Sequence, residues 1–152
     1  MYAIIDEQSN RSLVKPKFFE LFGIEGHASL YTLRTCSGRE ETFGRRANGF
    51  MVSHINKEEG IPLPTLVECD QIPDEREEVP SPEAAYQHPH LRHLVNEIPA
   101  MGMNSEIFIL LESDILRVHK VHKQCNGPDN ASYAQRAIFS KNYAGVSADT
   151  PT

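Results

Sequence analysis

Short apolar runs separated by polar, turn-forming segments are the main pattern along this chain. Residues Tyr2–Ile5 and Ile107–Leu111 are continuous apolar runs, which is typical of buried strands, and the second is the most apolar run in the chain. Residues Leu30–Thr35 follow the alternating pattern of a further strand. The segment Cys36–Arg39 has the composition of a hairpin turn, so a strand should turn back on itself there.

Further strands are predicted in the first half of the chain. Residues Thr42–Ile55 form one strand or two, with Gly44 and Gly49 as bends or bulges. Leu63–Cys69 is another strand candidate. The acidic, proline-bearing segment Asp70–Pro82 has no periodicity and is predicted to be an exposed loop.

The predicted helices are short. Ser12 could cap a helix with Pro16 in its first turn, an apolar phenylalanine-rich face and a stop at Gly23. Ser81 is the expected start of a second helix. Two more are predicted at His90–Val95 and Asp114–Val121. The inward residues of the last would be Ile115, Leu116 and Val118.

These elements predict a mostly β protein with short helices, and a small β-barrel-like domain is the natural class. We expect the domain to span residues 1–128, with a helical insertion near 81–98. Residues 129–152 are small and polar and are predicted to be a disordered or truncated tail.

Composition narrows the function classes. The 152 residues suit one domain, and the net charge of −6 argues against nucleic-acid binding. Arg45–Arg46 is a basic pair that we interpret as solvated surface. No apolar run approaches the roughly 18 residues of a membrane span, and no signal peptide is visible. The three cysteines are odd in number and widely spaced, which favours an intracellular, cytoplasmic protein.

Asp6 is the first candidate for chemistry, because it directly follows the apolar run Tyr2–Ile5. Aspartic peptidases hold two such carboxylates together, where they share a proton and act as base and acid on a water molecule. A chain with one such aspartate has to form a homodimer to supply the second. The alternative is that Asp6 only caps the turn after a strand.

Five ordered segments carry a family resemblance: Asp6–Ser12, Tyr31–Gly38, Leu63–Leu66, His88–Leu91 and Leu110–Leu116. Together they resemble the aspartic-peptidase segment of Pao/BEL retrotransposon polyproteins. The resemblance covers roughly residues 2–136. It implies a retropepsin-like β-barrel with half of the active site in each chain, and an endopeptidase that processes a polyprotein without a cofactor or metal ion.

The resemblance also assigns roles to individual residues. Asp6 would be the catalytic carboxylate, and Glu7, Gln8 and Ser9 would shape its loop. The flap that closes over a peptide would be the hairpin around residues 36–45. Two sets complete the assignment, the flap residues Thr35, Cys36, Ser37 and Gly38 and the structural supports Leu110, Leu111 and Asp114.

Two departures from the family pattern bear on catalysis. The retropepsin loop reads Asp, then Thr or Ser, then Gly, whereas Asp6 is followed by Glu7 and Gln8. Two Glu7 carboxylates near a dyad would repel each other, and Gln8 brings a side chain to a place where glycine lets the backbone approach the substrate. Glu112 stands where the family has glycine, and a charge at a buried strand end is costly unless it is paired. The alternative function is therefore an inactive barrel that binds peptides or dimerises.

Other chemistries have weaker support. A metal site is one rival, because His88, His90 and His93 are close in sequence and His119 and His122 have helical spacing. No HExxH motif accompanies them. A thiol or serine nucleophile has no local signature. The acidic stretch 70–78 could attract a basic partner, although a solvated loop explains it as well.

Overall fold

The structure is a computed structural model, and it describes residues 2–5, 10–54, 60–72, 79–137 and 144–148. Within these ranges the chain is mostly strands with a few short helices, so the predicted class is confirmed at this level. In chain order the elements are β1 (Tyr2–Ile5), β2 (Leu13–Val14), α1 (Pro16–Leu21), β3 (Ser29–Thr35), β4 (Gly38–Gly44), β5 (Arg46–Ala47), β6 (Phe50–His54), β7 (Gly60–Pro62), β8 (Leu66–Glu68), α2 (Pro82–Gln87), the 3-10 helix η2 (Pro89–Glu97), β9 (Ile107–Leu111), β10 (Lys123–Cys125), β11 (Ala134–Arg136) and β12 (Ala144–Ala148).

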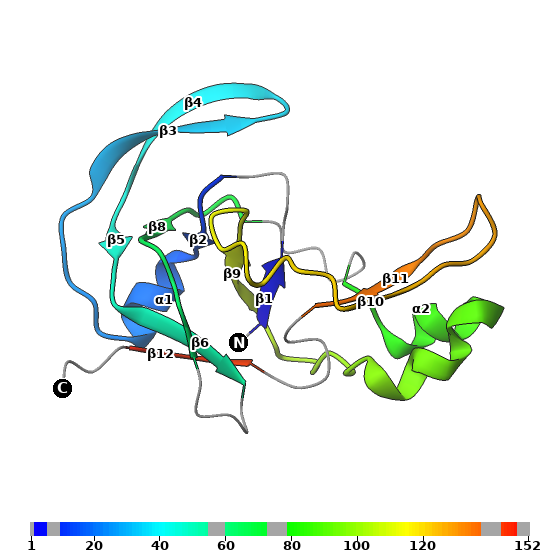
Figure 1. Cartoon of the computed structure of the whole chain (residues 1–152). Helices are drawn as coiled ribbons and strands as arrows, with labels where there is room; N and C mark the ends of the chain where they lie inside the picture. Colours follow the sequence, from blue (N-terminus) through cyan, green and yellow to red (C-terminus); the bar gives the residue numbers. More distant parts are fainter. Residues whose placement is uncertain (1, 6–9, 55–59, 73–78, 138–143, 149–152) are drawn as a thin grey trace.

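The strands of the described ranges form separate sheets and no closed barrel, unlike the barrel that the sequence predicts. The largest sheet has five strands in the order β1-β9-β2-β8-β5. Strands β3 and β4 bond to each other as a hairpin, which Figure 1 shows projecting from the body of the molecule. Strands β12, β6 and β7 form a third sheet, and β10 pairs with β11. The expected tail after residue 128 therefore contributes β11 and β12 to this architecture.

Strand β9 is an interior strand of the five-stranded sheet, with a neighbour on each side. It pairs in parallel with β1 and antiparallel with β2, so it separates two strands that are neighbours in sequence. All its side chains are buried, as expected of a continuous apolar run with both faces covered. The sequence predicts this central strand, and the structure confirms it.

Two apolar clusters cover the sheet, and β2 contributes to both. Its neighbouring residues Leu13 and Val14 enter different clusters, because successive side chains of a strand point to opposite faces. The cluster of Val14 includes Phe18 and Phe19 of helix α1. The cluster of Leu13 includes residues of β8 and β9, and Tyr31 of the hairpin packs against it.

Helix starts were predicted with mixed success. Ser81 caps α2 as predicted, because its hydroxyl oxygen accepts a hydrogen bond from the Ala84 backbone N–H at 3.1 Å. Helix α1 begins at Pro16, but Lys15 rather than Ser12 precedes it. None of the helices in the described ranges has the length and apolar character needed to cross a membrane.

The predicted helix at 114–121 is wrong, since this stretch consists of turns. Ile115 and Val118 are buried as expected, whereas Leu116 is 75% exposed. The carboxylate of Asp114, the expected helix cap, is engaged elsewhere. Its Oδ1 accepts from the Ser12 hydroxyl at 2.8 Å, and its Oδ2 accepts from the Ser12 backbone N–H at 3.1 Å.

Ser12 is fully buried and connects the chain before β2 with the chain after β9. Its hydroxyl oxygen also accepts from the Glu112 backbone N–H at 3.2 Å. One buried side chain thus fixes two segments that lie about a hundred residues apart in sequence.

We expect Ser12→Ala to lower the free energy of unfolding by about 1–3 kcal/mol, because it leaves the Glu112 N–H and an Asp114 oxygen without their buried partner. Urea denaturation monitored by circular dichroism measures the change. Ser29→Ala, at an exposed serine of β3, is the matched control and should leave the midpoint nearly unchanged. Equal midpoints for the two variants would contradict the proposed role of Ser12.

Candidate active site

The two ends of the predicted catalytic loop are described, and they lie beside β9. Strand β1 ends at Ile5, which is in register with Leu111 of β9. The described chain resumes at Asn10, just before β2 on the other side of β9. The loop residues themselves, Asp6, Glu7, Gln8 and Ser9, lie outside the described residues.

A groove of about 890 Å³ opens between the hairpin and the sheet. One wall is formed by Asn10, Arg11 and Leu13, directly after the predicted catalytic loop. The facing wall is the stretch Tyr31–Arg34 of strand β3. The remaining lining residues come from β5 and from the chain at β8; they are Arg46, Thr65 and Val67. The hairpin and the start of β2 therefore enclose the same space.

An ion pair fixes the base of the hairpin to the sheet. Arg45 follows the last residue of β4, and its guanidinium donates to both carboxylate oxygens of Glu68 in β8, at 2.9 and 2.6 Å. The Arg45 backbone N–H donates to the same carboxylate at 2.9 Å. The guanidinium also lies over the Phe19 ring, 4.4 Å from its centroid, which connects the ion pair to helix α1.

This arrangement favours the charged form of Glu68. The hydrogen bonds from Arg45 lower the pKa of Glu68, and they outweigh the opposing effect of partial burial. Because the two-pronged geometry matches a guanidinium to a carboxylate, the contact also fixes orientation.

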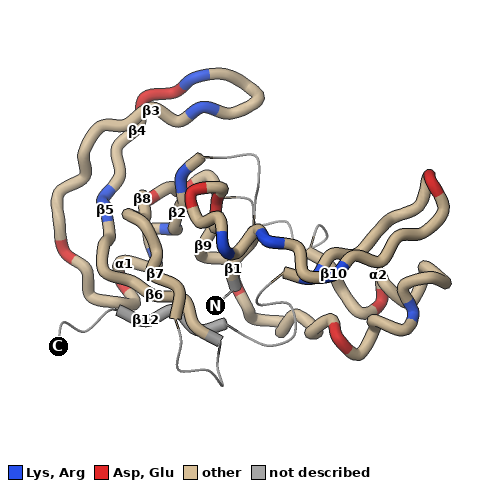
Figure 2. The backbone as a smooth tube through the Cα atoms, viewed as in Figure 1, with Lys and Arg blue, Asp and Glu red and all other residues tan. Residues whose placement is uncertain are grey.

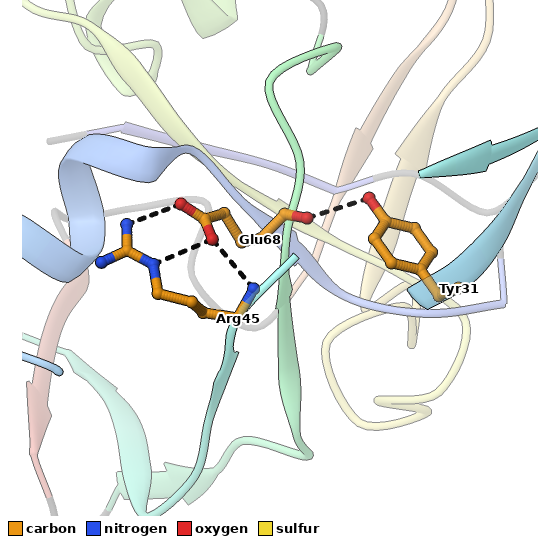
Figure 3. Close-up of polar contacts among 3 residues, drawn as sticks. All are labelled: Tyr31, Arg45 and Glu68. Atoms are coloured by element: carbon orange, nitrogen blue, oxygen red, sulfur yellow. Dashed lines mark hydrogen bonds and ion pairs between the residues drawn. The ribbon is translucent and has the colours of Figure 1, made fainter. Parts of the chain in front are cut away.

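Tyr31 provides a second attachment at the same place. Its hydroxyl donates to the Glu68 backbone carbonyl at 2.9 Å, so one residue of β8 holds both hairpin strands, as Figure 3 shows. Burial, and then the neighbouring Cys69 thiol, raise the pKa of Tyr31 far above its usual range, so the hydroxyl keeps its proton. Gly44 is required here, because a Cβ atom at this position would lie 2.5 Å from the Glu68 carbonyl oxygen.

The predicted flap residues form the turn of the hairpin. Cys36 and Ser37 are the turn, and Gly38 has a positive φ of 136° that favours glycine. The Thr35 and Ser37 hydroxyl groups lie within hydrogen-bond distance at 3.0 Å. All of these residues are exposed, and the groove is lined by the strand before them rather than by the turn itself.

Two of the predicted support residues lie in the sheet beside β1, and the third, Asp114, lies in the turn that binds Ser12. Leu110 and Leu111 are buried in β9 opposite Ile4 and Ile5. Glu112, the residue after the last residue of β9, is fully buried. Its backbone carbonyl lies 2.7 Å from the His119 Nε2 atom, so the turn after β9 folds back onto the strand end.

The histidines do not form a recognisable metal centre within the described ranges, where no group of three potential ligands is close enough to hold an ion. The His88 and His90 rings lie near each other, with centroids 5.8 Å apart. The His90 Nε2 atom lies 2.7 Å from the Ser132 carbonyl oxygen, so this ring connects η2 to the chain before β11.

Sequence reasoning missed the arginines of the groove, Arg11, Arg34 and Arg46. They come from separate parts of the chain, and only the hairpin brings them to one space. The sequence predicts solvated surface for the pair at 45–46, whereas Arg45 binds Glu68 and the exposed Arg46 lines the groove. The alternation of neighbouring side chains along an extended chain is the signal that could have separated them.

Comparisons with protein-family models, with curated proteins and with solved structures find no match to this chain.

Replacing Glu68 by Gln should lower the free energy of unfolding by about 1–2 kcal/mol at pH 7, because a charge-assisted contact with Arg45 is lost. The folded-state pKa of Glu68 is lowered, so its contribution is present above the unfolded carboxyl pKa of about 4.3 and is lost as the pH falls through the folded value. Urea denaturation from pH 7 to pH 3 should show the two proteins converging below about pH 4.3. Glu25→Gln, at an exposed carboxylate, is the control; a pH-independent difference for Glu68→Gln would contradict the ionic role.

Tyr31→Phe should loosen the hairpin without unfolding the sheet. We expect the backbone amides of β3 and β4 to exchange about fivefold faster, equivalent to about 1 kcal/mol for one neutral hydrogen bond. Hydrogen exchange resolved by peptide mapping measures this, with the amides of β9 as the internal reference. Uniform acceleration of both regions would show that the change destabilises the whole domain instead.

Proposed function

We propose that this chain is a retropepsin-like aspartic-peptidase domain of a retroelement polyprotein, and that it binds an extended polypeptide in the groove between β3 and the start of β2. The observation that carries the proposal is the position of this groove. Its wall begins at Asn10, four residues after Asp6 in sequence, and its other side is a projecting hairpin. Peptide hydrolysis needs a carboxylate close to a groove that holds the peptide, and the groove begins four residues after Asp6 in sequence.

The shape of the hairpin supports an extended peptide as the ligand. Strand β3 pairs with β4 along one edge, and its other edge has no partner among the described strands. Its consecutive residues Tyr31–Arg34 all line the groove. Since neighbouring side chains of a strand point in opposite directions, continuous lining indicates that the strand edge faces the groove. A peptide can therefore add to this edge through backbone hydrogen bonds.

The pairing of β1 with β9 supports the assignment of Asp6. Ile5 is held in register with Leu111, and β9 is buried on both faces. Asp6 directly follows β1 in sequence, and the pairing of β1 with this buried strand fixes the position from which the loop begins, which suits a catalytic group. In the proposed homodimer each subunit contributes one Asp6, and the two carboxylates share a proton.

An inactive peptide-binding module is the second candidate. It is favoured by the buried Glu112 and by the sequence Glu7-Gln8 in place of a small hydroxyl residue and glycine. In this version the groove and the hairpin keep their roles while hydrolysis is lost.

Cleavage of a mixed peptide library between pH 4 and pH 7 tests the proposal. Asp6→Asn should lower the cleavage rate by about 100-fold or more, because a general acid–base group is removed. Asp129→Asn, at an exposed residue, is the matched control and should cleave like the parent. Cleavage that survives Asp6→Asn would overturn the assignment of Asp6.

If the parent protein is folded but cleaves no peptide, further variants are needed to test the proposal. The double change Glu7→Ser and Gln8→Gly restores the family loop, with Glu112→Gly added in a third protein. Asp6-dependent cleavage that appears only in these variants would favour the inactive module. Cleavage in none of them would reject peptidase ancestry as the explanation of the groove.

A further inference from the structure

The described lining of the groove beneath the hairpin has a charge opposite to that of the whole chain. Among the described residues, this lining includes three arginines and no Asp or Glu, whereas the chain has a net charge of −6. Arg11 precedes β2, Arg34 lies in β3 and Arg46 lies in β5, so three separate segments contribute one positive charge each. Figure 2 shows basic positions on these segments.

The three guanidinium groups are available to a ligand. All three residues are exposed. Among the described residues no carboxylate forms an ion pair with any of them; the ion pairs found there are Lys17–Glu106 and Arg45–Glu68. Arg45 thus serves the fold, whereas its neighbour Arg46 faces the groove.

We infer that the groove selects polypeptides that carry acidic side chains, with Arg11, Arg34 and Arg46 as the residues that determine this specificity. This inference rests on the proposed peptide-binding function and adds the substrate class. A guanidinium presents a planar fork of donors that matches a carboxylate with two parallel hydrogen bonds. An extended peptide on the β3 edge directs alternate side chains to the same side, where separate arginines can each take one carboxylate.

The rest of the lining favours a peptide over a nucleic acid. Leu13, Leu33 and Val67 give the groove an apolar component that suits side chains. The aromatic residue of the groove, Tyr31, is already packed against the core and bonded to Glu68, so its ring is not a free stacking platform for bases.

Binding is tested on the full chain carrying Asp6→Asn, so that cleavage does not interfere. The probes are three ten-residue peptides labelled with an uncharged dye, in which a common Val and Thr background carries four Glu, four Gln or four Lys residues. We expect the Glu peptide to bind about tenfold more tightly than the Gln peptide at 50 mM salt, with the difference shrinking at 500 mM salt. The Lys peptide should bind most weakly.

Arg11→Gln, Arg34→Gln and Arg46→Gln, each made alone, should weaken binding of the Glu peptide by about two- to fivefold and leave binding of the Gln peptide unchanged. The matched control is Arg136→Gln in β11, which makes the same charge change outside the groove. An equal loss of affinity for the Glu peptide in the control would show that only net charge matters, and would overturn the inference. A single-stranded oligonucleotide that displaces the Glu peptide at lower concentration than unlabelled Glu peptide would assign the arginines to a nucleic acid, which also overturns it.

The outcomes separate this inference from the proposed function. Asp6-dependent cleavage without any preference among the three peptides would reject the acidic specificity and leave the peptidase standing. Arginine-dependent binding of the Glu peptide, together with no cleavage by the parent or by the restored-loop variants, would support the specificity and reject the peptidase.

Discussion

The burial of strand β9 is the constraint on which the rest of the structure depends. Strand β1 has no other partner among the described strands, and β2 reaches the sheet between β9 and β8. Each large aliphatic side chain of β9 that leaves water contributes about 1.5–3 kcal/mol, so this short strand is a large part of the folding free energy. The predicted catalytic loop connects β1 to β2, which are the two neighbours of β9 in the sheet. The distance that the loop spans is therefore set by the spacing of these strands.

Polar contacts determine how the β3–β4 hairpin is oriented relative to the sheet. Hydrophobic packing has no direction, so it does not by itself orient the hairpin above the sheet. The contacts of Arg45 and Tyr31 with Glu68 supply this orientation at the hairpin base, while the turn at Cys36 stays exposed. Further along the hairpin, Leu33 packs against a core cluster and Glu40 Oε2 accepts a hydrogen bond from Gln71 Nε2 at 3.2 Å, so only the turn extends away from the body.

The sequence predicts the elements whose determinants are local. The buried strand β9 follows from a continuous apolar run, the hairpin turn from its glycine, and the start of α2 from a serine followed by proline. The run at Tyr2–Ile5 also forms a strand, but Ala3 and Ile5 are exposed, because β1 lies at the edge of the sheet. The failed helix at 114–121 has a tertiary cause, because Asp114 binds Ser12 about a hundred residues away. The groove and its arginines could not be predicted from the sequence for the same reason. Nothing local distinguishes Arg46 from Arg45, and only the position of Glu68 assigns one to the fold and leaves the other facing the groove.

The pairing of β1 with β9 also has a consequence for the order of folding. Residues 2–5 find their partner only at residues 107–111, so most of the chain has to leave the ribosome before this part of the sheet can close. Such long-range pairing raises contact order and slows folding, because the entropy cost of closing a long loop comes before the stabilising contacts form. Until then the first strand has an open edge that can pair with other chains. The pairing of β1 with β9 is thus completed only after the chain has been synthesised at least to residue 111.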